Sequence, residues 1–216
     1  MIEIVNHVLE NELYYNDTVV LKYKIEYPSI RKSRYWYGYN QFNEYNYNHA
    51  IELKKYCETE LFKEAKELYD FNHANGYPIM VYEIILNYEI TYQNNALISL
   101  YTDEYMFLGG AHGNTKREAQ NWNLQTGKQI TLNELFPNNP YYIINILKQI
   151  NHKIADQIEN GEGQYFDNYC QLVQENFRLE NFYIIPGAVV IFFNQYEIAP
   201  YSSGIPIFEI TFSSIE

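Results

Sequence analysis

Residues Phe182–Ile210 read FYIIPGAVVIFFNQYEIAPYSSGIPIFEI, an apolar stretch near the end of a 216-residue chain. Turn-forming residues interrupt it at Pro186-Gly187, at Asn194-Gln195 and at Ala199–Gly204. Short apolar runs bounded by such residues are typical of strands buried in a sheet. This segment therefore predicts closing strands that pack inside an apolar core.

The first hundred residues predict a strand, a loop, a helix and a hairpin. Val19–Tyr27 alternates apolar and charged residues, and Pro28 is expected to end this strand because it lacks a ladder donor. Residues 31–48 show no clear period and are expected to form an ordered loop. A helix is predicted for His49–Tyr69 with Asn48 as its N-cap. A hairpin over 79–92 and 96–107 follows, with its apolar face under that helix.

The rest of the chain predicts a second set of strands and helices. Thr126-Gly127-Lys128 is expected to reverse the chain between short strands at 119–124 and 129–132. A helix is predicted after Pro140, with a buried stripe formed by Ile143, Leu147, Ile150, Ile154 and Ile158. A short helix over 166–177 leads into the closing strands.

This order of elements favours an α+β fold with mostly antiparallel sheets. We expect two packed subdomains, 1–108 and 109–216, each a mostly antiparallel sheet with one or two helices on one face. Both cysteines, Cys57 and Cys170, fall on apolar helical faces and are expected to be buried and free. A disulfide or a catalytic thiol is the alternative for them.

Composition limits the possible partners. The formal net charge of −12 opposes binding to nucleic acid or to an anionic membrane. No apolar run approaches the roughly 20 residues of a membrane helix, and the first residues lack the pattern of a signal peptide. No nucleic-acid partner and no membrane segment are therefore expected, and compartment and oligomeric state stay open.

The chain shows no motif for a metal, a cofactor or a catalytic centre. Its five histidines are scattered, and neither an H-x-x-x-H pair nor a Cys-x-x-Cys pair is present. A phosphate-binding loop, a G-x-S-x-G elbow and a dinucleotide-binding fingerprint are also missing. We therefore expect no metal, no cofactor and no catalytic residue.

Two segments carry candidate ligand-binding residues. In GGAHGN (109–114), Gly109 and Gly110 permit close backbone approach, and His112 and Asn114 offer polar groups. The alternative is a structural turn whose imidazole bonds a backbone carbonyl. In the aromatic stretch 31–47, Trp36 and Tyr37 are candidates for stacking on a sugar or a protein. Arg31, Lys32 and Arg34 beside these aromatics also resemble a single-strand nucleic-acid platform, which the overall acidity opposes.

Several motifs resemble known envelope domains. The first half, with Tyr27–Ile30 and Phe42-Asn43, resembles the domain that precedes the catalytic part of peptidoglycan N-acetylmuramic acid deacetylase C. The second half resembles the domain of unknown function that follows it. The matching stretches are GGAHGN, TGKQITL (126–132) ahead of Leu135-Phe136, and FNQYEIAPY (193–201) with Gly204. The same pair of domains forms the extracytoplasmic part of the lysozyme-sensing anti-sigma-V factor.

The resemblance implies an α+β, extracytoplasmic module that binds a protein such as lysozyme or a peptidoglycan glycan. No catalytic residue carries over, because the known chemistry belongs to other domains or proteins. Neither a deacetylase domain nor a sigma-binding segment is present in this sequence. Tyr196 and Tyr201 of the matching motif are expected either to contact a ligand or to bond the backbone at turns.

Three hypotheses of function follow. The leading one is a non-catalytic binding or sensing module for an envelope partner. The alternative is a hydrolase or deacetylase of acetylated glycans that uses His112 with an acid brought near by folding. The third is an assembly protein that uses an exposed sheet edge.

Overall fold

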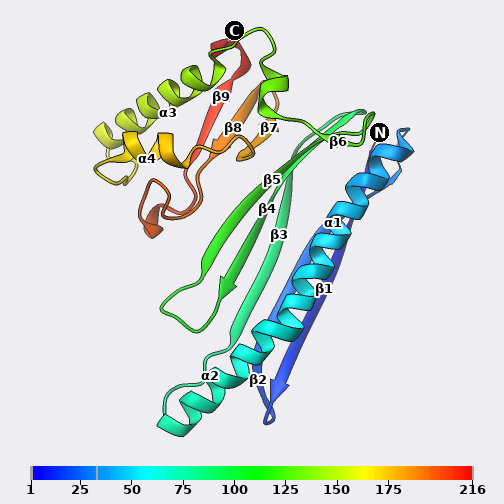
Figure 1. Ribbon diagram of the computed structural model, residues 1–216, viewed down its shortest axis with the longest axis vertical. Helices are drawn as coiled ribbons and strands as arrows, with labels where there is room; N and C mark the ends of the chain where they lie inside the picture. Colours follow the sequence, from blue (N-terminus) through cyan, green and yellow to red (C-terminus); the bar gives the residue numbers. More distant parts are fainter. Residues whose placement is uncertain (1, 33, 216) are drawn as a thin grey trace. The chain divides into compact units, whose positions relative to one another are not determined.

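The computed structural model describes residues 2–32 and 34–215 (Figure 1). Six strands form one mixed sheet in the order β1-β2-β3-β4-β5-β6, and three more form a separate sheet in the order β7-β8-β9. The bounds of the strands are β1 Glu3–Tyr15, β2 Thr18–Lys32, β3 Tyr82–Gln93, β4 Leu97–Phe107, β5 Asn114–Asn123, β6 Lys128–Gln129, β7 Phe182–Ile185, β8 Ala188–Phe192 and β9 Ile207–Thr211. The fold is α+β, as the element order predicts.

The chain divides into two compact units made of alternating segments. The first contains Met1–Tyr88, Thr102–Lys116 and Leu124–Gly127, and the second contains Glu89–Tyr101, Arg117–Asn123 and Lys128–Glu216. The long strands β3, β4 and β5 contribute residues to both units. Each unit has its own hydrophobic core.

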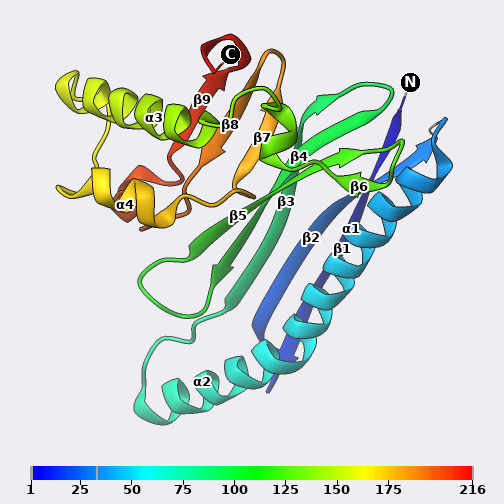
Figure 2. The same ribbon diagram turned by 45° about the horizontal axis from the view of Figure 1, so that its top comes forward.

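In the first unit, a long helical segment runs along β1 and β2 (Figures 1 and 2). It consists of α1 (Trp36–Tyr56), a π-helical turn (Cys57–Leu61) and α2 (Phe62–Asn75). Gly76 ends it in the left-handed conformation with φ of 69°, which suits glycine. Core residues of the helix meet those of the strands, and the cluster includes Leu53, Cys57, Leu61, Ala65, Leu21, Ile25, Ile84 and Leu86. The helix therefore covers Tyr82, Ile84 and Leu86 of the predicted hairpin face, together with β2, which was not part of that prediction.

The predicted loop over 31–48 is wrong, because α1 begins at Trp36 and Asn48 lies inside it. The buried positions of α1 do follow helical spacing: Gly38, Phe42, Asn46, Ala50 and Leu53. Two of them, Gly38 and Asn46, are not apolar, so a search for a hydrophobic stripe misses the helix. Asn46 is accommodated because its Nδ2 donates to the backbone oxygen of Phe42 at 2.9 Å.

The first strand, β1, was not predicted, and β2 continues past Pro28 to Lys32. No residue of β1 is fully buried, so its sequence lacks the regular alternation of apolar and polar residues that marks a half-buried strand. Pro28 is tolerated because β3 pairs only with Leu21–Ile25 of β2, so no third strand requires a donor at Pro28. The helical crossover explains why β2 and β3 run parallel, and this pair makes the six-stranded sheet mixed, although the pairs β1-β2 and β5-β6 are antiparallel as expected.

The second unit contains α3 (Tyr142–Glu159), α4 (Tyr169–Asn176) and the antiparallel sheet β7-β8-β9, and residues of all three belong to one buried cluster. Ile146, Ile150 and Ile154 of α3 belong to the same buried cluster as Val189 and Ile210 of the sheet. The predicted stripe is correct at Ile150 and Ile154 but wrong at Ile158, which is 45% exposed near the end of the helix. Both cysteines are free, as expected, but Cys170 is exposed rather than buried.

Candidate functional site

The aromatic candidates lie at the start of α1. The exposed fraction is 66% for Trp36 and 54% for Tyr37, and their ring centroids are 6.3 Å apart. A Cβ placed on Gly127 would lie 2.9 Å from the ring of Tyr37, so this ring packs directly on the turn at Thr126–Lys128. Tyr37 thus has a structural contact on one face and solvent on the other.

The GGAHGN loop contributes a second group of candidates. Gly109 has φ of +82°, and a Cβ there would meet the Leu68 side chain at 2.6 Å, so this position requires glycine. His112 is exposed, and its Nδ1 lies 3.0 Å from the backbone oxygen of Gly113. Gly110 follows Gly109 in the same turn, and Asn114 begins β5. This contact of His112 with a backbone oxygen agrees with the alternative that the loop is a structural turn whose imidazole bonds a backbone carbonyl.

These two groups do not form one site. The loop contacts Leu68 of α2, which lies 32 residues beyond Trp36 along the helical segment. At about 1.5 Å per residue, the two positions are roughly 48 Å apart along the helix.

The tyrosines of the FNQYEIAPY motif lie together in the second unit. Tyr196 and Tyr201 have ring centroids 5.9 Å apart, and Tyr196 is 50% exposed. Tyr196 adopts a left-handed conformation with φ of 68°, which is uncommon for a residue with a Cβ. The turn is held by Glu197, whose Oε2 accepts the N–H of Asn194 at 2.7 Å. Burial raises the pKa of the Glu197 carboxyl, although this hydrogen bond and the charge of Arg178 oppose the rise.

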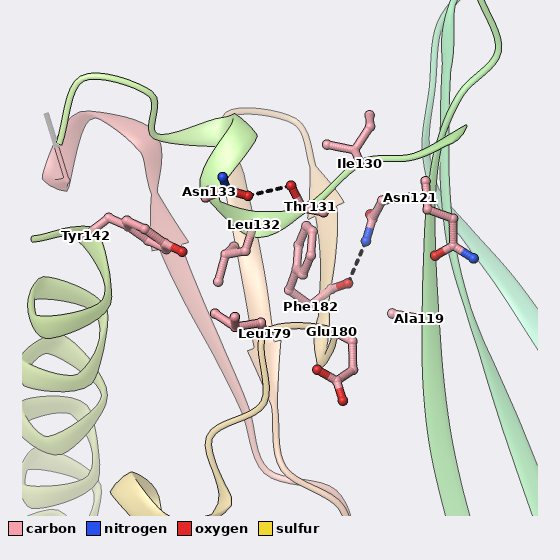
Figure 3. Close-up of a pocket in the computed structure, with 11 residues that line it drawn as sticks. Ala119, Asn121, Ile130, Thr131, Leu132, Asn133, Tyr142, Leu179, Glu180 and Phe182 are labelled. Carbon is pink, nitrogen blue, oxygen red and sulfur yellow. Dashed lines mark hydrogen bonds between the residues drawn. The ribbon is translucent and has the colours of Figure 1, made fainter. Parts of the chain in front are cut away.

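A cavity of about 570 Å³ lies within the second unit, in the region shown in Figure 3. Its walls come from β5, from the segment around Leu132, from the start of α3 and from the loop that enters β7. Three apolar side chains, Leu132, Leu179 and Phe182, converge in its interior (Figure 3). The ring of Tyr142 reaches toward them from α3, and polar groups surround them: Asn121, Gln129, Thr131, Asn133 and Glu180. An apolar interior with a few polar groups is the usual character of a small-molecule site.

Side chains fix the wall of the cavity where β7 enters it. Nδ2 of Asn121 donates to the backbone oxygen of Phe182 at 2.8 Å, as Figure 3 shows. Ser99 donates to Asn121 Oδ1 at 2.7 Å and accepts the N–H of Ile184 at 2.8 Å. The oxygen of Ile184 accepts the hydroxyl of Thr91 at 2.7 Å. These bonds satisfy backbone groups of an edge strand and hold the cavity wall in place.

The segment on the other side of the cavity is equally ordered. Thr131 and Glu134 form a capping box, in which Glu134 Oε2 accepts the N–H of Thr131 at 2.7 Å. Hydrogen bonds from the backbone and the hydroxyl of Thr131 lower the pKa of the Glu134 carboxyl. The cavity is thus lined by structure that exists before any ligand binds.

None of the candidate residues named from the sequence lines this cavity. The TGKQITL stretch, singled out in the sequence for its family resemblance, contributes Gln129, Ile130, Thr131 and Leu132 to the lining, so a motif search could have found this part of the cavity. The other lining residues come from positions that are distant in sequence, and only folding brings them together. In the described part of the chain, no three histidine, cysteine or acidic side chains are grouped so that they could hold a metal ion. Within residues 2–32 and 34–215, no helix combines the length and apolar character of a membrane span.

Two family profiles match separate parts of the chain. Residues 15–115 match the family described as "Deacetylase PdaC", and residues 133–213 match the family described as "Protein of unknown function (DUF3298)". A search of curated proteins finds no match.

Two crystal structures share the fold. One is a DUF3298 family member from Bacteroides fragilis, with a TM-score of 0.73 and 17% identity over 98% of this chain and 91% of that chain. The other is a DUF3298 family protein from Pseudomonas aeruginosa, with a TM-score of 0.61 and 18% identity over 98% of this chain and 92% of that chain. The chain therefore combines a PdaC-type domain over residues 15–115 with a DUF3298 domain over residues 133–213.

Proposed function

We propose that this chain is a non-catalytic binding module for a cell-envelope glycan that carries N-acetyl groups. The observation that carries the proposal is the ordered cavity of about 570 Å³ in the second unit. Its size lies within the range of about 300–1,000 Å³ that small-molecule sites occupy.

The chemistry of the lining suits an N-acetylated sugar. The half-exposed side chain of Leu179 and the ring of Tyr142 offer an apolar surface for the acetyl methyl group and for the C–H face of a sugar ring, and the buried side chains of Leu132 and Phe182 form the floor beneath them. Glu180 and Gln129 supply an acceptor and an amide at the edge, where sugar hydroxyls need hydrogen-bond partners. Because the walls are already ordered, little conformational entropy is lost on binding.

The comparisons support a glycan of the cell envelope. The profile that matches residues 15–115 is named for a deacetylase, and PdaC domains relate to peptidoglycan deacetylation. This chain would then recognise the polymer on which such enzymes act. An extracytoplasmic location is part of the same proposal.

The lining also supports binding without catalysis. Among the described residues of the cavity, Glu180 is the one carboxylate, and there is no histidine or cysteine. Hydrolysis of a glycosidic bond or an amide by acid–base chemistry generally requires a second group that activates water. The alternative hydrolase would use His112, which lies on a different loop in the first unit.

Titration with the tetramer of β-1,4-linked N-acetylglucosamine, followed by amide NMR, tests the proposal. We expect shift changes around Thr131, Leu179 and Phe182. Tyr142→Ala and Leu179→Ala should weaken binding about tenfold, since each removes apolar contact area from the ligand. Tyr142→Phe keeps the ring, and Tyr141→Ala changes an exposed neighbour outside the lining. These two variants should bind like the parent chain.

Absence of shift changes at millimolar tetramer would disprove the glycan proposal. A parallel titration with lysozyme tests for a protein partner. If the chain binds lysozyme and does not bind the tetramer, its ligand is a protein and not a glycan. If the parent chain releases acetate from the tetramer and His112→Ala does not, the hydrolase alternative is correct instead.

A further inference from the structure

A second hollow in the second unit lies at the other end of α3. It has a volume of about 490 Å³, and Gln157, Glu162, Gln164, Tyr165, Ser202 and Ser203 are among its lining residues. An adjoining hollow of about 530 Å³ shares Gly163, Gln164 and Tyr165 with it, and adds Tyr169 and Pro200. We call the two hollows together the Gln164 groove. Ser202 and Ser203 of the Ala199–Gly204 turn line this groove, whereas neither residue lines the cavity of Figure 3.

Two loops build the Gln164 groove, and hydrogen bonds join them. The hydroxyl of Ser203 donates to the backbone oxygen of Gln164 at 2.8 Å, and that of Ser202 donates to Gln164 Oε1 at 3.3 Å. The phenol of Tyr165 donates to Gln157 Oε1 at 2.5 Å, which ties the first loop to α3. The groove is therefore a fixed surface and does not need to form when a ligand arrives.

The end of α3 sets the path of the first loop. Gly161 has φ of 69°, its N–H donates to the oxygen of Ile158 at 3.1 Å, and the N–H of Glu162 donates to the oxygen of Gln157 at 2.8 Å. This pair of bonds is a Schellman motif, which ends a helix and turns the chain sharply. A Cβ on Gly163 would lie 2.8 Å from the Tyr165 ring, so the backbone and the ring are in close contact.

The side chains of the groove indicate the class of ligand. Amides and hydroxyls both donate and accept hydrogen bonds, as adjacent sugar hydroxyls do. The rings of Tyr165 and Tyr169, 6.3 Å apart, offer apolar faces for the C–H side of a sugar ring. Among the described lining residues there is no lysine, arginine or histidine, so an anionic ligand would find no counter-charge.

We propose that the Gln164 groove is a second saccharide-binding site, so that the module holds a glycan polymer at two points. Tyr142 borders the first site and Gln157 borders the second, and they are 15 residues apart on α3. At about 1.5 Å per residue the sites are roughly 22 Å apart along the helix, too far for one sugar residue. Two weak sites on one polymer raise the apparent affinity by avidity, by about 10²–10⁴ when the geometry permits both to bind.

This inference rests on the proposed function, and NMR titration with the same N-acetylglucosamine tetramer separates the two. We expect two groups of shifting amides, one at residues 129–133 and 179–182 and the other at 161–165 and 200–203. Gln164→Ala should weaken the binding seen in the second group only, and Leu179→Ala should weaken the binding seen in the first group only, each by about tenfold. Gln171→Ala, which changes an exposed glutamine outside the groove, should leave both groups intact.

Binding to insoluble purified peptidoglycan supplies the second measurement. Gln164→Ala should lower the apparent affinity for the polymer about tenfold or more, because one of two linked sites is lost. Shifts confined to the first group, or unchanged polymer affinity of Gln164→Ala, would overturn the second site and leave the first in place. No shifts in either group would overturn both proposals.

Discussion

Asn194 and Arg117 exchange two hydrogen bonds, although 77 residues separate them in the second unit. The backbone N–H of Arg117 donates to Asn194 Oδ1 at 2.7 Å, and Asn194 Nδ2 donates to the backbone oxygen of Arg117 at 3.3 Å. The amide of Asn194 thus pairs with β5 as the backbone of a neighbouring strand would. Asn194 belongs to the FNQYEIAPY stretch, and this pairing gives that motif residue a structural role.

Replacement of Asn194 tests this role. Asn194→Asp keeps an acceptor for Arg117 N–H but loses the donor and brings a carboxylate close to a backbone oxygen. We expect Asn194→Asp and Asn194→Ala to lower the free energy of unfolding by about 1–3 kcal/mol, as loss of partners for part-buried polar groups does. Urea unfolding measures the change, and the exposed Asn160→Ala should stay within about 0.5 kcal/mol of the parent chain. Equal stability of Asn194→Ala and Asn160→Ala would contradict the assigned role.

Gly38, the one glycine of α1, is expected to tolerate no larger residue. A Cβ at this position would lie 1.9 Å from the backbone oxygen of Leu124, so the helix and the strand end touch through their backbones. Gly38→Ala should cost about 3 kcal/mol or more, the upper part of the range for overpacking, because a backbone atom cannot rotate away. Thermal unfolding followed by circular dichroism measures it. Gly110→Ala is the matched control, since the nearest atom to its added Cβ is 3.8 Å away.

The two cysteines should differ sharply in reactivity. Cys57 is buried in the π-helical turn, and burial raises the pKa of its thiol to about 12, so the reactive thiolate is scarce at neutral pH. Cys170 is exposed. Reaction with a chromogenic disulfide reagent at pH 8 should therefore show one fast thiol in the folded chain and two after denaturation. Cys170→Ser should remove the fast phase, and a fast phase that survives it would show that Cys57 is accessible.

Glu197 predicts a specific pH dependence. Because burial raises the pKa of this carboxyl above its ordinary value of 4.5, the folded chain binds its proton more tightly than the unfolded chain does. The stability that this group contributes is present below pH 4.5 and is lost as the pH rises through the raised pKa. Glu197→Gln keeps an acceptor for the N–H of Asn194 and cannot ionise.

We therefore expect the stability of Glu197→Gln, relative to the parent chain, to increase between pH 4.5 and pH 7. Urea unfolding at the two values measures this difference. Glu159→Gln, at an exposed position, should show no such trend. A relative stability of Glu197→Gln that falls between pH 4.5 and pH 7 would mean that the shift has the opposite sign.

Much of the fold is local in origin, and the sequence predicts that part well. The strands from Phe182 onward, the hairpin of β3 and β4, and α3 with Ile150 and Ile154 all depend on short-range periodicity and turn residues. The glycines of GGAHGN and of Thr126–Lys128 likewise predict that the chain turns at these two places. These features follow from the sequence because propensity and burial pattern agree at those positions.

Tertiary structure decided the remainder. Gly38, near the start of α1, lies against the backbone of Leu124, which is 86 residues away in the sequence. The parallel pairing of β2 with β3 requires the helical crossover between them, and the start of that helix carries no continuous apolar stripe. The cavity brings Asn121, Leu132 and Phe182 together from three segments, and the bonds that align them are made by side chains whose partners lie far along the chain. No local pattern encodes such contacts, because their free energy exists only once the separate segments have packed.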